Sequence, residues 1–185
     1  SICVAPKSRE SYPETTIKLT FNKVSNQYDL YEKIRGQEYK VDAFSDEYKS
    51  VLALYIFSKS KFEVRKYDVN VHDEIEGADS LNDVQRIFKT HLDEKYYSFL
   101  ELKPDRVILE KGTNDRYNVL FLGKNDSKIY IDKSRKLNSA AVVLYNFSIK
   151  LSRFYDLIDA IDVKTDSDFL ETLKELYLLG WSVQI

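Results

Sequence analysis

Apolar and polar residues alternate along the first part of the chain in the pattern of half-buried strands. The alternation covers residues 15–24, 27–34 and 38–44, and short turn signals separate the three runs. We therefore expect a three-stranded β-meander. The pattern leaves one alternative open, in which residues 26–35 form a helix that ends at Gly36.

Two helices and a further strand are predicted next. Residues 45–60 begin with a serine, carry acids in the first turn and then become strongly apolar, which predicts a largely buried helix. Residues 61–71 alternate again and predict a strand, and residues 72–80 read as an acidic connection. Ser80 can cap the following helix. The apolar stripe of that helix consists of Leu81, Val84, Ile87, Phe88 and Leu92.

The C-terminal part changes to a different order of elements. Three strand-like runs, 99–111, 116–123 and 127–132, are followed by three short helical segments. The expected helices cover 138–150, 152–161 and 167–180, with Asn138, Ser152 and either Ser167 or Asp168 as their caps.

The last helix has a clear stop signal. Gly180 suits the left-handed residue after a helix end, and the apolar residues 181–185 predict a short returning strand. Glu171, three residues after Asp168, suggests a capping box. The core-facing stripe of this helix is Phe169, Leu173, Leu176 and Tyr177.

These elements together predict an α+β protein in two closely packed parts. Residues 1–97 would hold the β-meander with its helices and have no assigned role. Residues 98–185 would form a winged-helix-like part of three strands followed by three helices. No Ser/Gly-rich linker separates the two parts.

Composition narrows the function classes. The 185 residues carry a formal net charge of -2 and a single cysteine, Cys3, so neither a strongly basic nucleic-acid binder nor an internal disulfide is indicated. A reducing, cytoplasmic setting is the expectation. The apolar runs are too short to span a bilayer, and no phosphate-loop, dinucleotide or zinc-protease motif occurs. No cofactor and no metal site are predicted.

Three C-terminal segments carry a resemblance to a known family. The stretches "KLNSAAVVLYNF" (136–147), "FYDLIDAI" (154–161) and "DFLETLKELYLLGW" (168–181) resemble the small peptide chaperone of pyrroloquinoline-quinone biosynthesis and related precursor-peptide recognition domains. Leu137 and Asn138 match the Leu-Asn pair that ends the third strand in that family.

Further positions match the same family. Ala140 and Ala141 stand where it has a pair of small residues, and Leu173, Leu176 and Gly180 match the end of its last helix. The Asp-Gly that the family usually has between its first two helices is absent here.

The resemblance implies non-catalytic binding of an extended peptide or protein segment at a strand edge, as in a peptide-modification pathway. An exposed edge presents main-chain N–H and C=O groups that an added strand can pair with. The resemblance places that edge at 127–133, with the outward face of the last helix as the second wall. The implied binding residues are Ser127, Lys128, Ile129, Tyr130, Ile131, Asp168, Glu171, Lys174 and Glu175.

A nucleic-acid-associated winged-helix regulator is one alternative. Residues 150–185 contain seven acids and four cations, which would place negative charge against phosphates. Nucleic acid is therefore not the expected partner. Lys133, Arg135 and Lys136 form the one basic cluster, which could attract an acidic segment or RNA.

A small metal-dependent nuclease of the PD-(D/E)xK type is the second alternative. Glu101 and Lys103 form a Glu-x-Lys pattern on a predicted strand, and Asp73 or Asp93 could supply the other carboxylate ligand. The pattern is common, and two charges at i and i+2 also describe one solvated strand face.

Overall fold

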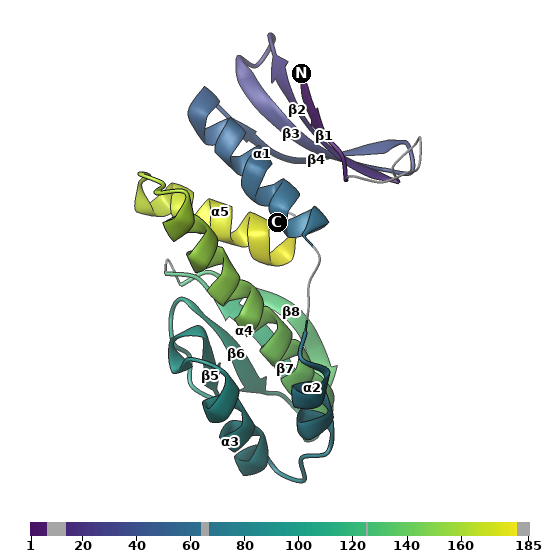
Figure 1. The fold of residues 1–185 in the computed structure, drawn as a ribbon, viewed down its shortest axis with the longest axis vertical. Coiled ribbons are helices and arrows are strands. Elements are labelled where there is room, and N and C mark those ends of the chain that lie inside the picture. Colours follow the sequence, from purple (N-terminus) through teal and green to yellow (C-terminus); the bar gives the residue numbers. More distant parts are fainter. Residues whose placement is uncertain (7–13, 64–66, 125, 181–185) are drawn as a thin grey trace. The chain divides into compact units, whose positions relative to one another are not determined.

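The chain is an α+β protein that divides into two compact units. The computed structural model describes residues 1–6, 14–63, 67–124 and 126–180. Residues 1–64 and 165–185 form the first unit, and residues 65–164 form the second (Figure 1). The chain therefore divides at two places, whereas the sequence pattern predicted one boundary near residue 97, which lies inside the second unit.

The first unit contains the predicted β-meander. Its antiparallel strands are β1 (Ile2–Val4), β2 (Thr15–Asn22), β3 (Gln27–Ile34) and β4 (Gln37–Phe44), in the order β1-β2-β3-β4. The alternative helix over 26–35 is wrong, because β3 pairs with β2 on one side and β4 on the other. The short strand β1 was not predicted.

Two helices complete this unit. Helix α1 (Glu47–Phe62) contacts β2, β3 and β4 and also packs on α5 (Ser167–Leu179). The predicted stripe of α5, from Phe169 to Tyr177, is buried. Gly180 has a φ of 71° and its N–H donates to the Leu176 carbonyl at 3.0 Å, which confirms the predicted left-handed end.

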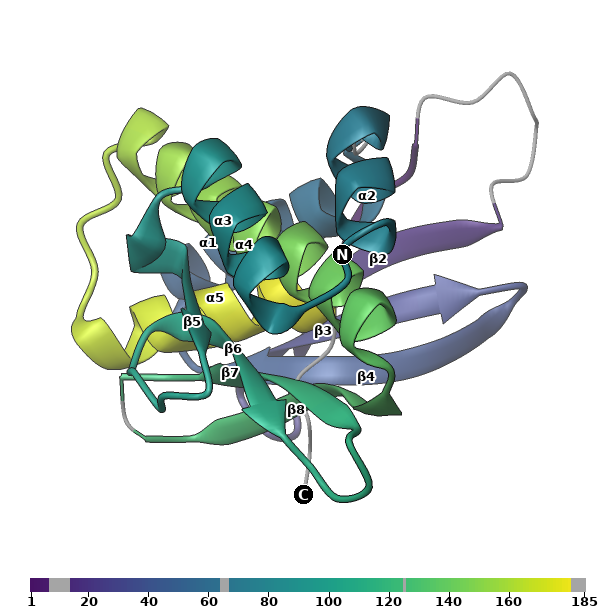
Figure 2. The ribbon, with the colours of Figure 1, turned by 90° about the horizontal axis from the view of Figure 1, so that it is seen from below.

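The second unit is built around a four-stranded sheet. It begins with α2 (Val69–Glu76), α3 (Leu81–His91) and the short 3-10 helix η1 (Glu94–Tyr96). The strands β5 (Tyr97–Phe99), β6 (Arg106–Lys111), β7 (Tyr117–Leu122) and β8 (Lys128–Arg135) follow in the order β5-β6-β7-β8 (Figure 2). Helix α4 (Leu137–Ala160) closes the unit. β5 is parallel to β6, and the other pairs are antiparallel.

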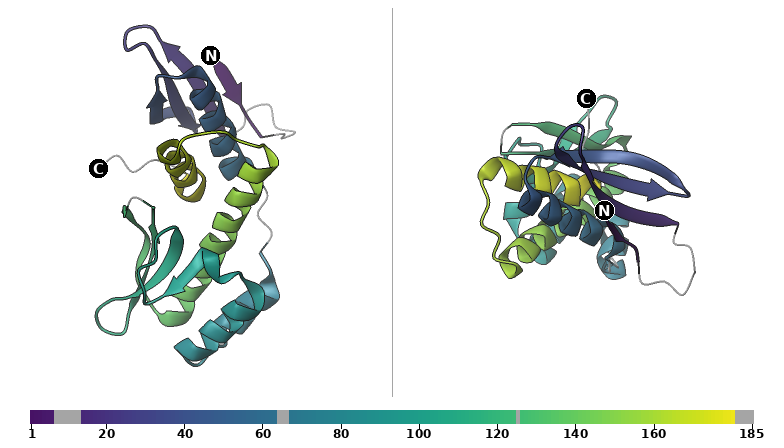
Figure 3. Two further views of the ribbon diagram at one scale, coloured as in Figure 1. Left: turned by 90° about the vertical axis from the view of Figure 1, so that its left-hand side faces the viewer. Right: turned by 90° about the horizontal axis from the view of Figure 1, so that it is seen from above.

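Helix α4 runs across one face of this sheet, and α2 and α3 pack beside it (Figure 3). Phe88 of α3 lies edge-on to Tyr97 and Phe99 of β5, each at a centroid distance of 5.1 Å, and to Tyr145 of α4 at 5.8 Å. This aromatic cluster identifies the face that the helices cover. The small buried cluster of Ile108, Leu120 and Leu122 lies on the other face of the sheet, because successive side chains of a strand point to opposite faces.

The segment between α1 and α3 differs from its prediction. The predicted strand over 61–71 is wrong in its described parts, because α1 continues to Phe62 and α2 begins at Val69. The acidic connection over 72–80 is largely helical for the same reason. Asp68 caps α2 by accepting from the Asn70 N–H at 3.0 Å. Residues 64–66 lie outside the described part.

The C-terminal helices also differ from their prediction. One continuous helix, α4, replaces the first two of three expected helices, so Ser152 lies inside a helix and caps nothing. The N-cap of α4 is Lys136, without a side-chain cap bond, and that of α5 is Asp166, so neither Asn138 nor Asp168 is a cap. The predicted strand over 181–185 lies outside the described residues. Within the described residues no helix is both long and apolar enough to cross a membrane.

Candidate functional site

The outer edge of β8 pairs with no strand of the described residues. Gly123 N–H donates to the Ser127 carbonyl at 3.0 Å, which marks these two as a hydrogen-bonded pair at the start of the β7–β8 ladder. Such pairs alternate along antiparallel strands, so the main-chain groups of Ile129 point toward β7. Those of Lys128 and Tyr130 point away from it. We call residues 127–131 the β8 edge.

Side chains limit the length of this edge. The Lys133 N–H donates to the Asp132 carboxylate at 2.8 Å, and the Ser134 N–H donates to the Asn118 side chain at 3.0 Å. The register shifts in the same region, so Ile131 has no partner residue on β7. The β8 edge can therefore add only a short strand segment.

Glu110 of β6 organises the side chains beside the β8 edge. Its carboxylate accepts hydrogen bonds from Asn118 at 3.1 Å and from the Tyr130 hydroxyl at 3.2 Å, and Lys128 lies 3.5 Å away. Burial acts to raise the pKa of Glu110, but the two hydrogen bonds and the Lys128 charge lower it overall. The carboxylate thus stays ionised and holds Lys128 and Tyr130 in place on the strand.

The segment that contains the β8 edge is basic. Residues 127–136 carry one acid, Asp132, and four cations, Lys128, Lys133, Arg135 and Lys136. The Lys133 ammonium lies 4.3 Å from the centre of the Tyr130 ring, and Arg135 pairs with Asp132 at 2.9 Å. Charge of this sign favours an acidic ligand segment over a basic one.

Only some of the α5 side chains that were predicted to form the second wall point outward. Glu171 and Lys174 were predicted to point outward, and this is wrong: both are buried, with Lys174 at 0% exposure, and their charges pair at 2.6 Å. Asp168 is exposed and Glu175 is partly exposed. The helix residues belong to the first unit and residues 127–131 to the second.

Asp168 contributes to an open pocket of about 440 Å³ within the first unit. The N-terminal ends of α1 and α5 meet there, with Asp46 and Asp166 as their caps. Lys49 pairs with Asp166 at 2.6 Å, and burial raises the pKa of Asp42. Asp46 and Asp166 are thus already used as helix caps, and Asp166 is also an ion-pair partner.

The residues of the nuclease alternative do not assemble into one group. Glu101 and Lys103 form an ion pair at 2.7 Å, but they lie in the loop between β5 and β6 and not on the predicted strand. Asp73 is an exposed residue of α2, and Asp93 caps η1. Within the described residues, no three His, Cys, Asp or Glu side chains are arranged to hold a metal ion.

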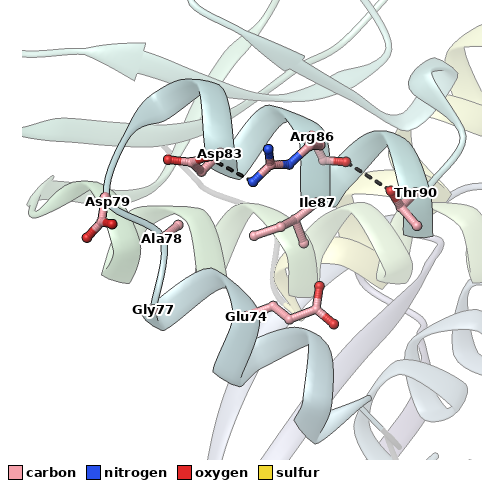
Figure 4. Close-up of a pocket in the computed structure, with 8 residues that line it drawn as sticks. All are labelled: Glu74, Gly77, Ala78, Asp79, Asp83, Arg86, Ile87 and Thr90. Atoms are coloured by element: carbon pink, nitrogen blue, oxygen red, sulfur yellow. Dashed lines mark hydrogen bonds and ion pairs between the residues drawn. The ribbon is translucent and has the colours of Figure 1, made fainter.

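A second pocket, of about 410 Å³, lies between α2 and α3 in the second unit (Figure 4). Glu74 faces it from α2, and Arg86 and Thr90 line it from α3. Arg86 pairs with Asp83 at 3.0 Å, while the Thr90 hydroxyl donates to the Arg86 carbonyl. The side chains of Asp83, Arg86 and Thr90 thus make their polar contacts within α3, and the Glu74 carboxylate lies 3.6 Å from the His91 imidazole.

No family model, curated protein or solved structure matches this chain in the comparisons with known proteins. The site therefore rests on its own geometry. Sequence reasoning found the β8 edge but missed Glu110, which holds its side chains. The sequence does single out Glu110, because it is the one acid of its strand and directly follows three apolar residues.

Proposed function

We propose that this chain is a non-catalytic recognition protein that binds an extended peptide or protein segment by strand addition at the β8 edge. The observation that carries the proposal is the outward direction of the main-chain groups of Lys128 and Tyr130. The proposal requires this strand edge alone, and not a winged-helix arrangement or a second wall on α5.

Main-chain pairing sets the scale of the affinity. Lys128 and Tyr130 together offer two N–H and two C=O groups, and four hydrogen bonds at about 0.5–1.5 kcal/mol each give about 2–6 kcal/mol. Association costs at least about 4 kcal/mol in lost freedom. Side-chain anchors must therefore contribute, and Tyr130, with 40% of its surface exposed, is the main apolar one.

The basic character of the segment suggests the ligand class. An acidic, extended segment would meet Lys128, Lys133 and Arg135 along the strand. A precursor peptide of a peptide-modification pathway is the partner that the family resemblance implies. For such a ligand we expect an affinity on the order of micromolar, weakened by added salt.

The test compares Lys128→Pro with Lys128→Ala. Lys128 is the first residue of β8, where proline is tolerated, and its N–H points away from β7. Both variants lose the ammonium, but only the proline variant also loses the edge N–H. We expect both to fold and the proline variant to bind more weakly than the alanine variant.

The ligands for this test are random linear peptides selected against the whole protein, and binding is measured by calorimetry with amide-exchange mapping. Protection of the Lys128 and Tyr130 amides on binding would support strand addition. Equal affinity of the two variants, or protection confined to residues outside β8, would refute it. Ile129→Pro serves as the folding control, because its N–H points into the ladder and its loss should destabilise the sheet.

A further inference from the structure

The outer strand β4 leaves one short stretch of main chain open to pairing. β4 is the last strand of the first sheet, and β3 is the only described strand that pairs with it. Its first four residues, 37–40, are all exposed. The register shifts directly after Lys40, and the Ala43 N–H further along donates to the Asp42 carboxylate at 2.7 Å. The open stretch therefore ends at Lys40, and we call residues 37–40 the β4 edge.

The direction of the main-chain groups on the β4 edge follows from the neighbouring ladder. The N–H of Arg35, directly after β3, donates to the Glu14 carbonyl at 2.8 Å, so the main-chain groups of Arg35 are directed toward β2. These groups alternate in direction along a strand, so the even-numbered residues of β3 bond to β4. Their partners at the start of β4 are odd-numbered. The N–H and C=O groups of Glu38 and Lys40 therefore point outward.

The β4 edge is complementary to a second copy of itself. If two such edges pair antiparallel about a two-fold axis at Tyr39, Glu38 of each copy lies opposite Lys40 of the other. The outward groups then form four main-chain hydrogen bonds, and each carboxylate faces an ammonium. The two neighbouring registers would place Glu38 opposite Glu38 or Lys40 opposite Lys40, and like charges directly opposite each other are destabilising. The charges thus select one register.

Contacts within the chain hold both charged side chains along the sheet. The Glu38 carboxylate accepts from the Lys18 ammonium at 3.1 Å, and the Lys40 ammonium lies 2.7 Å from the Asp29 carboxylate. The side chains of Glu38 and Lys40 remain 38% and 43% exposed, so each can meet a further charge. Across the paired edges, the four charges would alternate in sign. Because the side chains are already held, pairing costs less conformational entropy.

Tyr39 supplies an aromatic contact at the proposed axis. Its side chain is 51% exposed, and its hydroxyl donates to the Gln37 side chain at 2.6 Å. In the selected register the two Tyr39 residues form a non-hydrogen-bonded pair, in which the Cα atoms lie about 4.5 Å apart. Aromatic pairs at such positions add to the stability of a sheet.

The β4 edge and the β8 edge carry different patterns of charge. A charge on an edge strand opposes pairing where the facing strand offers it no counter-charge. The β8 edge is of that kind toward its own copy, because residues 127–131 contain Lys128 and no acid. The β4 edge carries both signs two residues apart. A second copy of this chain therefore suits β4 and does not suit β8.

We propose that two copies of this chain form a two-fold dimer through their β4 edges, which joins the two four-stranded meanders into one continuous sheet. The contact consists of four main-chain hydrogen bonds, two charge pairs and one aromatic pair. An interface this short predicts a weak dimer, with a dissociation constant on the order of 100 μM. The contact uses no residue of the β8 edge, so the proposal stands whether or not peptides bind there.

The direct test is analytical ultracentrifugation of the full chain at concentrations from about 10 μM to about 1 mM, a range that brackets the expected dissociation constant. The average mass should rise from that of one chain toward that of two. Amide exchange over the same range should show growing protection of the Glu38 and Lys40 N–H groups. A chain that stays monomeric throughout, or a dimer without protection at these two amides, would overturn the proposal.

Two variants of Glu38 separate its charge from its main-chain N–H. Both Glu38→Ala and Glu38→Pro lose the carboxylate, but only the proline variant loses the outward N–H, at an edge position where proline is tolerated. Each substitution acts twice in a two-fold dimer. We expect the dimer to weaken about twofold or more in Glu38→Ala and about a further fivefold or more in Glu38→Pro. Lys128→Pro, at the β8 edge, is the control and should leave dimerisation unchanged. Equal dimerisation of the two Glu38 variants would contradict main-chain pairing.

Single cysteines test the register and do not depend on the proline variant folding. The background is Cys3→Ser, because Cys3 is an exposed free thiol. Tyr39→Cys places two thiols in a directly opposed pair, within the Cα separation of a disulfide. In Gln37→Cys, each thiol lies opposite Val41 of the other copy, about 13 Å along the strand from its counterpart. Mild oxidation should therefore cross-link Tyr39→Cys several-fold faster than Gln37→Cys. Equal rates would mean that the chains meet at random or in another register, and would refute the assigned pairing.

Discussion

Substitutions of Asn138 distinguish two roles for its side chain, as the cap of helix α4 or as a hydrogen-bonded link between α2 and α4. The sequence pattern predicts Asn138 as the cap of a helix, but the structure places it in the first turn of α4, after the N-cap Lys136. Its Nδ2 donates to the Glu76 carbonyl at 2.7 Å and to the Ala78 carbonyl at 2.9 Å. These carbonyls lie at the end of α2, where backbone acceptors lack helical partners. Asn138 therefore clamps α2 to α4.

The two hydrogen bonds of Asn138 predict how much the free energy of unfolding falls in each Asn138 variant, and which variant loses more. Two hydrogen bonds at about 0.5–1.5 kcal/mol each predict that Asn138→Ala lowers the free energy of unfolding by about 1–3 kcal/mol. Asn138→Asp should cost at least as much, because a carboxylate cannot donate and would face two carbonyl oxygens. A cap would behave differently, since Asp and Asn are about equally good helix caps.

The assay is urea unfolding of the full chain, combined with hydrogen exchange of amides in α2 and the first turn of α4. Ser139→Ala, at the exposed neighbouring position, is the control and should change little. Low pH should restore part of the stability of Asn138→Asp, because a protonated acid can donate one bond. If Asn138→Asp were as stable as the native chain while Asn138→Ala was weakened, the clamp would be wrong and the cap correct.

Two further predictions concern the first unit. Lys40 lies 2.7 Å from the buried Asp29 and, with hydrogen bonds from Asn22 and Tyr31, lowers its pKa against the opposing effect of burial. The resulting stabilisation should be fully present above the ordinary carboxyl pKa of about 4, and it should be lost as pH falls through the lower pKa of Asp29 in the folded protein. In Asp29→Asn, the free energy of unfolding should therefore change less with pH over this range. Gly180→Ala should lower the free energy of unfolding, measured by thermal or urea unfolding, by about 1–2 kcal/mol. The φ of 71° disfavours a side chain, and an added Cβ would lie 3.0 Å from the Lys61 side chain. An unchanged melting temperature would mean that α5 ends differently.

Local patterns predicted most strands and several helix ends correctly. The meander, β7, β8 and the caps at Ser80 and Gly180 follow from alternation and from residues with a strong positional preference. The segment 61–71 was misread because its alternation also contains a helical signal. Val71 and Ile75, both buried, are four residues apart, and Asp68 precedes them as a cap.

The length of α4 and the burial of charges on α5 were beyond local reasoning. Residues 136–165 contain no Gly or Pro, so nothing in the chain requires the break that Ser152 suggested. Glu171 and Lys174 look like a solvated face in sequence, but their charges satisfy each other at 2.6 Å, which allows both to be buried. At the candidate site, the edge was predictable, whereas its short length depends on the Asp132 and Asn118 side-chain bonds to main-chain N–H groups.

The division of the first unit between the two ends of the chain has a consequence for synthesis. Helix α1 ends at Phe62 and its packing partner α5 begins at Ser167, so the ribosome makes every described residue of the second unit before any of α5. The second unit can fold as soon as α4 emerges, but the apolar surface of α1 that α5 covers must wait. During that interval the nascent chain presents a surface suited to chaperones, and translation speed between residues 62 and 167 sets how long it stays uncovered.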